Sequence, residues 1–277
     1  MQYDKGVVRR RVGQAKYTDI AITSLLSLRF VFKLPLRAME GFAKSLVALM
    51  NSDIEVPDYS TLSMKINKMH IKLPPVYKDS CGHVMSLDST GVKIHGQGEW
   101  NRKKHSQRDR RQWVKMHLAV DNESMQILAV ESTADDVHDC EVFDQLVDAV
   151  PDKINKALGD GAYDTLATYK KSMESGIELE ALPRDNAVVE QNAKDLYVIK
   201  RNEHVAYYKE KGIYAWANKN GYWPRNRVEA TMSRFKTTFS GTLSSRKVKS
   251  QKNEIVLKCA ILNIFANVIM PSRQNAV

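Results

Sequence analysis

The sequence has too few cysteines for a disulfide framework. It contains three, Cys81, Cys140 and Cys259, and they are widely spaced. Their odd number and wide spacing do not fit paired disulfides or a cysteine-based zinc site, so we expect a reducing interior compartment. The seven histidines also lack paired ligand spacing, and we interpret His117 and His138 as structural residues.

Long apolar runs are missing as well. The most apolar stretch, residues 259–270, is too short to span a bilayer and contains two asparagines, so we expect a buried helix and no membrane partner. The opening residues, MQYDKGVVRRR, are charged and have no apolar run behind them, which does not fit a secretory signal. A cytoplasmic location is therefore expected.

Positive charge, in contrast, is abundant. The chain has 42 Lys and Arg residues against 32 Asp and Glu residues, a net charge of +10. The excess is uneven, because residues 1–72 carry +6, residues 73–160 carry −4 and residues 161–277 carry +8. Basic surfaces favour polyanions such as nucleic acid. The acid-rich middle is where metal-binding carboxylates are most naturally sought.

Residues 1–75 predict a small helical region. Apolar residues recur at helical spacing within residues 17–50, with a break at Leu34–Pro35, and a third helical pattern covers residues 61–69. Three short helices resemble a helix-turn-helix unit, although a plain helical support domain fits the same pattern. We interpret residues 1–75 as an N-terminal helical, DNA-binding region, with the linker KLPPVYK (72–78) at its end.

Residues 76–277 predict an α/β domain. Strand patterns alternate with helical patterns, which predicts a mixed sheet with helices packed on it. Strands are expected at residues 83–94, 112–121, 125–133, 154–160 and 176–183, and helices at 138–150 and 162–175. Residues 184–221 predict a polar, mostly helical insertion. Pro224 suits the first turn of a helix that runs to about Phe239.

Three acids of this domain are candidate metal ligands. We expect Asp88 to end the first strand, Asp160 to end the fourth, and Glu229 to lie one to two turns into the late helix. Each alone is weak evidence, since an aspartate at a strand end is usually a turn former or a helix cap. Together they can converge on one point, where bare carboxylates would repel one another. Oxygen-only ligands suit Mg²⁺ or Mn²⁺, and two such ions support in-line phosphodiester displacement.

The residues around Glu229 allow two interpretations. Arg225, Glu229 and Lys236 are four and seven residues apart, so they share one helix face, beside an apolar stripe that would pack on the sheet. Cations near a metal-binding carboxylate suit a phosphate substrate. An exposed helix with an Arg225–Glu229 pair, worth a few tenths of a kcal/mol, explains the same spacing. Spacing alone slightly favours this second interpretation.

The motifs resemble those of a known family, the bacterial insertion-sequence transposases of the DDE type. The branch named for insertion sequence five is marked by a Tyr, two residues, an Arg, three residues, the catalytic Glu, six residues and a Lys. Residues LDSTGVKIHGQGEW (87–100) resemble the family's first-Asp region and LGDGAYD (158–164) its second. Segments 17–42, 56–63 and 241–263 are also similar, so the resemblance covers nearly the whole chain. The residues that fit the Tyr–Arg–Glu–Lys spacing are Tyr222, Arg225, Glu229 and Lys236.

The resemblance implies an RNase H-like core in which Asp88, Asp160 and Glu229 bind two Mg²⁺ ions, or Mn²⁺ in their place. It implies a DNA transposase that binds the inverted-repeat ends of an insertion sequence. Water would cleave the strand, and the freed 3′ hydroxyl would be joined to target DNA. Since two ends must be joined, we expect a homo-oligomer, at least a dimer on double-stranded DNA, in the bacterial nucleoid.

The same analogy assigns DNA contacts. Arg225 and Lys236 would contact phosphates, and Tyr222 would help to place the terminal nucleotides. A basic segment between the first two strands, residues 101–115, is interpreted as a hairpin extension that grips the DNA backbone, although a solvated charged loop explains it too. Lys115 closes this segment. Its other candidates are Arg102, Lys103, Lys104, Arg108, Arg110 and Arg111.

Two features depart from the family. Its members commonly have more residues ahead of the block that begins here near Tyr17, and Pro224 is not expected inside the motif. An N-terminally short chain leaves open a catalytically inactive, transposase-derived DNA-binding protein. A related nuclease acting on branched or hybrid nucleic acid is a third interpretation. The basic N-terminal region and the Tyr–Arg–Glu–Lys spacing count against it.

Overall fold

The computed structural model describes residues 16–77, 82–94 and 113–269. The six basic candidates between Arg102 and Arg111 lie outside these ranges, so their predicted DNA contacts stay predictions. The chain divides into two compact units, residues 1–65 and 66–277.

The first unit consists of short helices with apolar residues on one side. Ile22, Leu26 and Phe30 recur every fourth residue and are buried on one side of the first helix. Thr18 caps that helix by accepting the N–H of Ala21 at 3.2 Å. The boundary between the units falls in the last turn of the third helix. The helices are α1 (Asp19–Val31), α2 (Leu36–Leu49) and α3 (Tyr59–Lys68).

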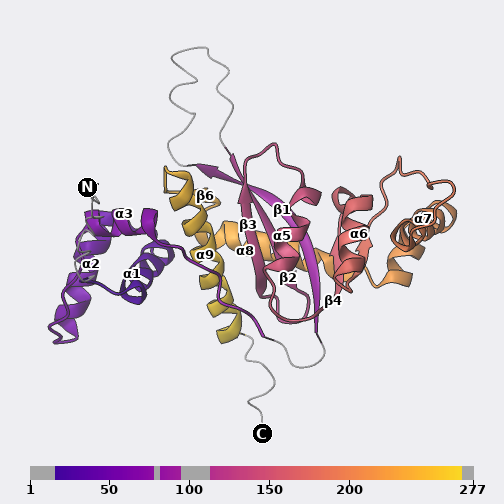
Figure 1. The fold of residues 1–277 in the computed structure, drawn as a ribbon. Coiled ribbons are helices and arrows are strands. Elements are labelled where there is room, and N and C mark those ends of the chain that lie inside the picture. The colour runs from indigo at the N-terminus through magenta and orange to yellow at the C-terminus, as the bar shows by residue number, and fades with distance from the viewer. Residues whose placement is uncertain (1–15, 78–81, 95–112, 270–277) are drawn as a thin grey trace, which may run out of the picture. The chain divides into compact units, whose positions relative to one another are not determined.

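The second unit is built on a mixed sheet, which confirms the predicted α/β class (Figure 1). In the strand order β3-β2-β1-β4-β5, the first three strands are antiparallel neighbours, whereas β4 runs parallel to β1 and β5 parallel to β4. A short strand, β6 (Thr242–Leu243), pairs with the end of β1 and was not expected from the sequence. The other strands are β1 (His83–Ile94), β2 (Trp113–Asp121), β3 (Ile127–Thr133), β4 (Ile154–Gly159) and β5 (Glu178–Ala181).

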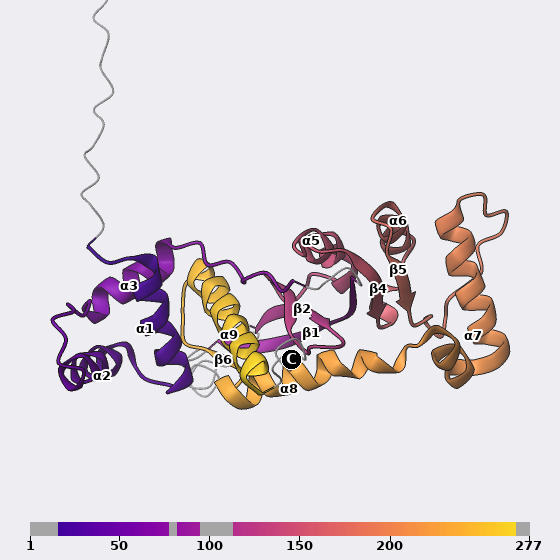
Figure 2. The ribbon, with the colours of Figure 1, turned by 90° about the horizontal axis from the view of Figure 1, so that it is seen from below.

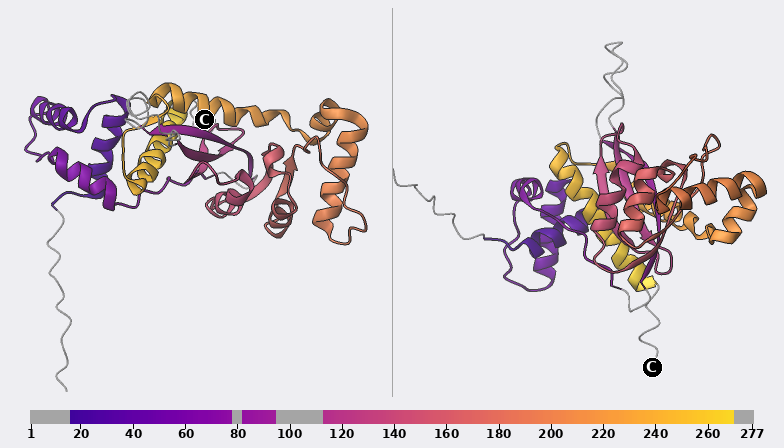
Figure 3. Two further views of the ribbon diagram at one scale, coloured as in Figure 1. Left: turned by 90° about the horizontal axis from the view of Figure 1, so that it is seen from above. Right: turned by 45° about the vertical axis from the view of Figure 1, so that its right-hand side comes forward.

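Helices cover both faces of this sheet. Figures 2 and 3 show α5 (Phe143–Asp148) and α6 (Leu166–Glu174) on one face and α8 (Asn226–Phe239) along the other. The last helix, α9 (Val248–Ile269), packs against β3 and α8. Helix α7 (Leu196–Asn220) lies beyond β5 and packs against α6 (Figure 2). Among the described helices, none combines the length and the apolar content that crossing a membrane requires.

The alternation of side chains along β1 determines which face carries the candidate site. Met85 and Leu87 are fully buried in the core beneath α5. Because neighbouring side chains of a strand point to opposite faces, Ser86, Asp88 and Thr90 face α8 instead. All three contact the segment that leads into and forms α8.

Helix α8 is held on the sheet by the apolar stripe that the sequence predicts. Val228, Met232, Phe235 and Phe239 recur at three- and four-residue spacing, and each is at most 6% exposed. Burial of each such side chain stabilises the fold by about 1.5–3 kcal/mol, so the helix is anchored along its whole length. Glu229 and Lys236 lie beside this stripe on α8, close enough to β1 for Lys236 to reach Thr90.

Candidate active site

Asp88 was expected to end the first strand. It lies instead in the middle of β1. The strand continues to Ile94 because its antiparallel ladder with β2 runs on from the Asp88–Leu118 pair to the Lys93–Trp113 pair. Paired residues therefore flank Asp88 on both sides along the strand. The backbone N–H of Ser89 donates to the Asp88 carboxylate at 2.8 Å and fixes its orientation further.

Asp160 directly follows β4, as predicted. It is the N-cap of a short 3₁₀ helix, η2 (Gly161–Tyr163), and its Oδ1 accepts the backbone N–H of Ala162 at 2.9 Å. Since β1 and β4 are parallel neighbours, the residue after β4 comes beside the middle of β1. The sheet therefore brings the two aspartates together on the α8 side.

Arg225 joins the three acids. It ends the 3₁₀ turn η3 (Trp223–Arg225) that leads into α8, one helical turn before Glu229. Its Nη1 donates to Glu229 Oε1 at 2.6 Å, and its Nη2 donates to Asp88 Oδ2 at 2.9 Å. The same Nη2 lies 3.9 Å from Asp160 Oδ2. All three predicted metal ligands thus converge on one guanidinium.

The electrostatics of this cluster vary with depth. The side chains of Asp88 and Arg225 are 17% and 16% exposed, whereas those of Asp160 and Glu229 are 36% and 56% exposed. Burial raises the pKa of the Asp88 carboxyl, and the guanidinium of Arg225 opposes that rise. Asp160 and Glu229 raise this pKa further, because neighbouring negative charges disfavour ionisation. The cluster consequently favours a cation.

The donor atoms of the cluster fit a hard divalent cation. Asp88, Asp160 and Glu229 offer carboxylate oxygens alone, the ligand type that Mg²⁺ and Mn²⁺ prefer. Within the described parts of the chain, no group of three His, Cys, Asp or Glu side chains is assembled to hold a metal ion. The acids surround the positive guanidinium of Arg225 instead, so a cation already occupies the centre that they share.

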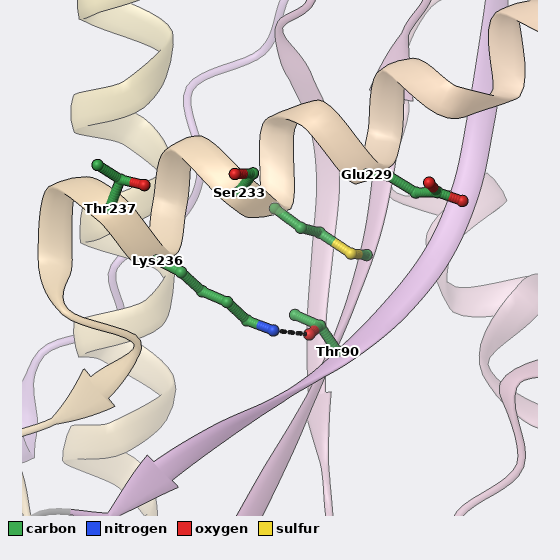
Figure 4. Close-up of a pocket in the computed structure, with 6 residues that line it drawn as sticks. Thr90, Glu229, Ser233, Lys236 and Thr237 are labelled. Atoms are coloured by element: carbon green, nitrogen blue, oxygen red, sulfur yellow. Dashed lines mark hydrogen bonds between the residues drawn. The ribbon is translucent and has the colours of Figure 1, made fainter.

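An open groove adjoins the acid cluster between β1 and α8. Lys236 extends across it and donates from Nζ to Thr90 Oγ1 at 2.5 Å (Figure 4). Hydroxyl and ammonium groups beside a carboxylate form a polar surface of the kind that meets a phosphate chain. The groove is lined by Thr90, Glu229, Met232, Ser233, Lys236 and Thr237.

Tyr222 is buried beneath the site. Its side chain is 8% exposed, its ring meets the edge of Trp216 at 5.1 Å between centroids, and its hydroxyl donates to the Gly159 carbonyl at 3.0 Å. Pro224 does not disturb this arrangement, because it occupies the first turn of η3, where its missing N–H is not needed. The structure therefore gives Tyr222 an internal contact, and its DNA contact stays a prediction.

Asp139 is a supporting residue that the sequence analysis missed. It lies 2.7 Å from Lys115 Nζ and 3.3 Å from His117 Nδ1. Although burial opposes its ionisation, bonds from His117, Lys115 and Ser89 hold the pKa of Asp139 well below its usual range. Ser89 follows Asp88 directly, so this network braces the strand beside the acid cluster. Only the acid-rich composition of the middle region hinted at it.

The same network corrects the interpretation of Lys115. From the sequence, Lys115 was placed in the basic segment expected to bind the DNA backbone. In the structure its ammonium also donates to the Val137 carbonyl at 2.9 Å, and its side chain is only 22% exposed. His117 is fully buried and contacts Thr133 Oγ1 at 2.8 Å through Nε2, which confirms its structural role.

The chain matches two protein-family models. An α/β sheet that brings three carboxylates together beside a polar groove is an arrangement found in phosphoryl-transfer enzymes. Residues 79–264 match a family model described as "Transposase DDE domain", and residues 2–97 match a second model with the same description. The chain therefore belongs to the DDE transposases, enzymes of DNA transposition that bind DNA and use divalent metal ions.

Proposed function

We propose that this chain is a transposase of the insertion-sequence-five branch with an RNase H-like core. It binds the inverted-repeat ends of its element, hydrolyses a phosphodiester to free a 3′ hydroxyl and joins that hydroxyl to target DNA. The convergence of Asp88, Asp160 and Glu229 on Arg225 is the observation that carries the proposal. The sheet order and the helix that carries Glu229 along the sheet agree with it.

Asp88, Asp160 and Glu229 are the residues that would hold the metal. Two Mg²⁺ ions, or Mn²⁺ in their place, would supply activation of the attacking water and stabilisation of the leaving oxygen. The protein's own contribution is position: Asp88 is fixed by the strand ladder, and Asp160 by its role as a helix cap. Glu229 is the most exposed of the three and faces the groove where the DNA strand would lie.

The groove supplies contacts to the DNA backbone. Lys236 would bind a phosphate by charge, and the hydroxyls of Thr90, Ser233 and Thr237 would donate hydrogen bonds to its oxygens. Residues 1–75 would recognise the repeat, and the basic segment from Arg102 to Arg111 would grip the backbone further along. Because two element ends are joined, a homo-oligomer of at least two chains would assemble on DNA.

Strand cleavage of duplexes that carry the element's own inverted repeats tests the proposal. Purified protein with Mg²⁺ is expected to release a 3′ hydroxyl at the repeat end and to join it to a second duplex. The Glu229→Gln variant should bind the same duplex without cutting it. Ca²⁺ should allow binding without chemistry, since it tolerates looser coordination than Mg²⁺.

The alternatives give different products. DNA binding without cleavage in wild type and variant alike would contradict the enzymatic proposal and leave a transposase-derived binding protein. Preferential cutting of RNA–DNA hybrids or branched duplexes over repeat ends would indicate a nuclease.

A further inference from the structure

Arg225 is fastened by the same oxygen atoms that a metal ion would need. Its two terminal nitrogens contact Glu229 Oε1 and Asp88 Oδ2 at 2.6 and 2.9 Å, and Asp160 Oδ2 is 3.9 Å away. Its Nε is buried and has no hydrogen-bond partner among the described residues. Its described hydrogen bonds therefore all run from the terminal nitrogens to the acids, which hold the guanidinium in place.

The guanidinium of Arg225 reduces the repulsion among the three carboxylates in the metal-free protein. Three carboxylates that converge without a cation repel one another, which would spread them apart or protonate one of them. A single positive charge shared by Asp88, Asp160 and Glu229 offsets this repulsion and keeps the three side chains together. The acids are thereby held close to one another before any metal arrives.

The guanidinium of Arg225 must leave this position when a divalent metal ion binds. A divalent cation bound to these oxygens would lie next to a positive guanidinium in a partly buried site, and the two would repel strongly. An arginine cannot relieve this repulsion by losing its proton, because guanidinium stays charged in proteins. It can relieve it only by moving away from the acids.

We infer that Arg225 is a positioning residue that holds Asp88, Asp160 and Glu229 together in the metal-free protein and exchanges places with the metal. The inference rests on the proposed metal-dependent function and adds a consequence to it. The displaced guanidinium is then free to pair with a phosphate of the DNA strand in the adjoining groove. Metal binding and DNA binding therefore strengthen each other through this one side chain.

Titration of Mn²⁺ into the DNA-free protein by calorimetry tests the exchange. Arg225→Gln removes the competing charge and should tighten Mn²⁺ binding by about tenfold, because a repulsive unit charge is lost next to the metal. Arg227→Gln is the matched control, since Arg227 is an exposed arginine in the first turn of α8 and contacts none of the acids through any described bond. Its Mn²⁺ affinity should equal that of wild type. Circular dichroism and thermal melting confirm that each variant is folded.

The outcomes separate the inference from the function that it rests on. Weaker or unchanged Mn²⁺ binding by Arg225→Gln, with wild type binding normally, would overturn the exchange and leave the metal site intact. A purely structural role for Arg225 predicts that weakening, because the acids would spread apart. Failure of both proteins to bind millimolar Mn²⁺ would overturn the inference together with the proposed function.

A second readout tests the coupling without catalysis. The affinity for an inverted-repeat duplex is measured with Ca²⁺ and with a chelator. The dissociation constant with chelator divided by the dissociation constant with Ca²⁺ gives the coupling. This ratio should be several-fold larger for wild type and Arg227→Gln than for Arg225→Gln. Equal ratios in all three proteins would contradict the coupling.

Discussion

The hydroxyl of Tyr222 donates a hydrogen bond to the backbone carbonyl of Gly159 across 3.0 Å. Gly159 immediately precedes Asp160, and Tyr222 immediately precedes the turn that carries Arg225. One buried bond thus connects the two segments that bring their charged residues together. Tyr222 supports the acid cluster from inside, whatever further contact it makes with DNA.

The Tyr222→Phe variant distinguishes a structural role of the hydroxyl from a direct contact with DNA. Tyr222→Phe loses one buried hydrogen bond and should lower the free energy of unfolding by about 1 kcal/mol. The cleavage rate should fall, while the dissociation constant of a repeat duplex in Ca²⁺ stays within twofold of wild type. Chemical denaturation and single-turnover cleavage measure the two effects. A large loss of duplex affinity without loss of stability would instead support direct contact between Tyr222 and DNA.

Lys236 should act on DNA through charge. Lys236→Gln removes a cation that bonds only the Thr90 hydroxyl among the described contacts, so stability should change by less than about 0.5 kcal/mol. Duplex affinity should fall for all sequences alike, and the slope of log K against log salt should become less negative by about 0.9. Lys209→Gln, an exposed lysine on α7 outside the groove, is the control. Identical salt slopes for Lys236→Gln and wild type would exclude a phosphate contact.

Asp139 should matter for stability in a pH-dependent way. Asp139→Asn breaks its ion pair with Lys115 and alters its contact with His117, and at neutral pH this should cost on the order of 3 kcal/mol. A carboxyl with a lowered pKa stabilises the fold above its ordinary pKa and loses that effect as the pH falls through the lowered value. The difference between wild type and variant should therefore persist at pH 5 and shrink in stronger acid. A difference that grows on acidification would contradict the ion-pair account.

Glu180 should show the opposite pH dependence. Burial raises its pKa to about 7, despite Lys156 at 3.5 Å from Oε1, and His204 Nδ1 lies 3.4 Å from Oε2. A raised carboxyl pKa means that the folded protein keeps a proton that the unfolded chain releases, so stability falls between about pH 4.5 and 7.

The matching variant, Glu180→Gln, cannot ionise and should be more stable than wild type above pH 7, on the order of 1–3 kcal/mol. The pKa of His204 is lowered to about 4 by burial, so this histidine costs stability as the pH falls below 6.5. Because His204 contacts Glu180, it contributes to the difference between the two proteins below pH 6.5, and the comparison above pH 6.5 reports Glu180. Denaturation curves between pH 5 and 8 measure that difference, and a constant value across the range would contradict a titrating Glu180.

Local sequence patterns predicted the strand and the helix that carry the site. The bounds of β1 follow from the alternating run at residues 83–94, and the end of α8 at Phe239 follows from its apolar stripe. Spacing also placed Arg225, Glu229 and Lys236 on one face. These features depend on neighbours in the chain, so the sequence carries them directly.

Contacts between segments that are far apart in the sequence could not be predicted from local patterns. The sequence could not show that Asp88 lies inside a ladder, because its partner strand begins after the basic segment. Nor could it show that α9 starts with buried polar residues. Glu254 is buried because it accepts the backbone N–H groups of Ser244 and Ser245 at 2.9 Å and pairs with Lys258 at 2.7 Å. The central position of Arg225 depends on three segments at once.

The most direct test of the central claim is the single-turnover cleavage rate of variants in the acid cluster. Asp88→Asn, Asp160→Asn and Glu229→Gln should each cut repeat duplexes at least about 10³-fold more slowly than wild type, with duplex binding in Ca²⁺ retained. The double variant Asp88→Asn/Glu229→Gln should be no slower than the single ones, because residues that act as one unit are not additive. Near-normal cleavage by any single variant would contradict the three-acid site.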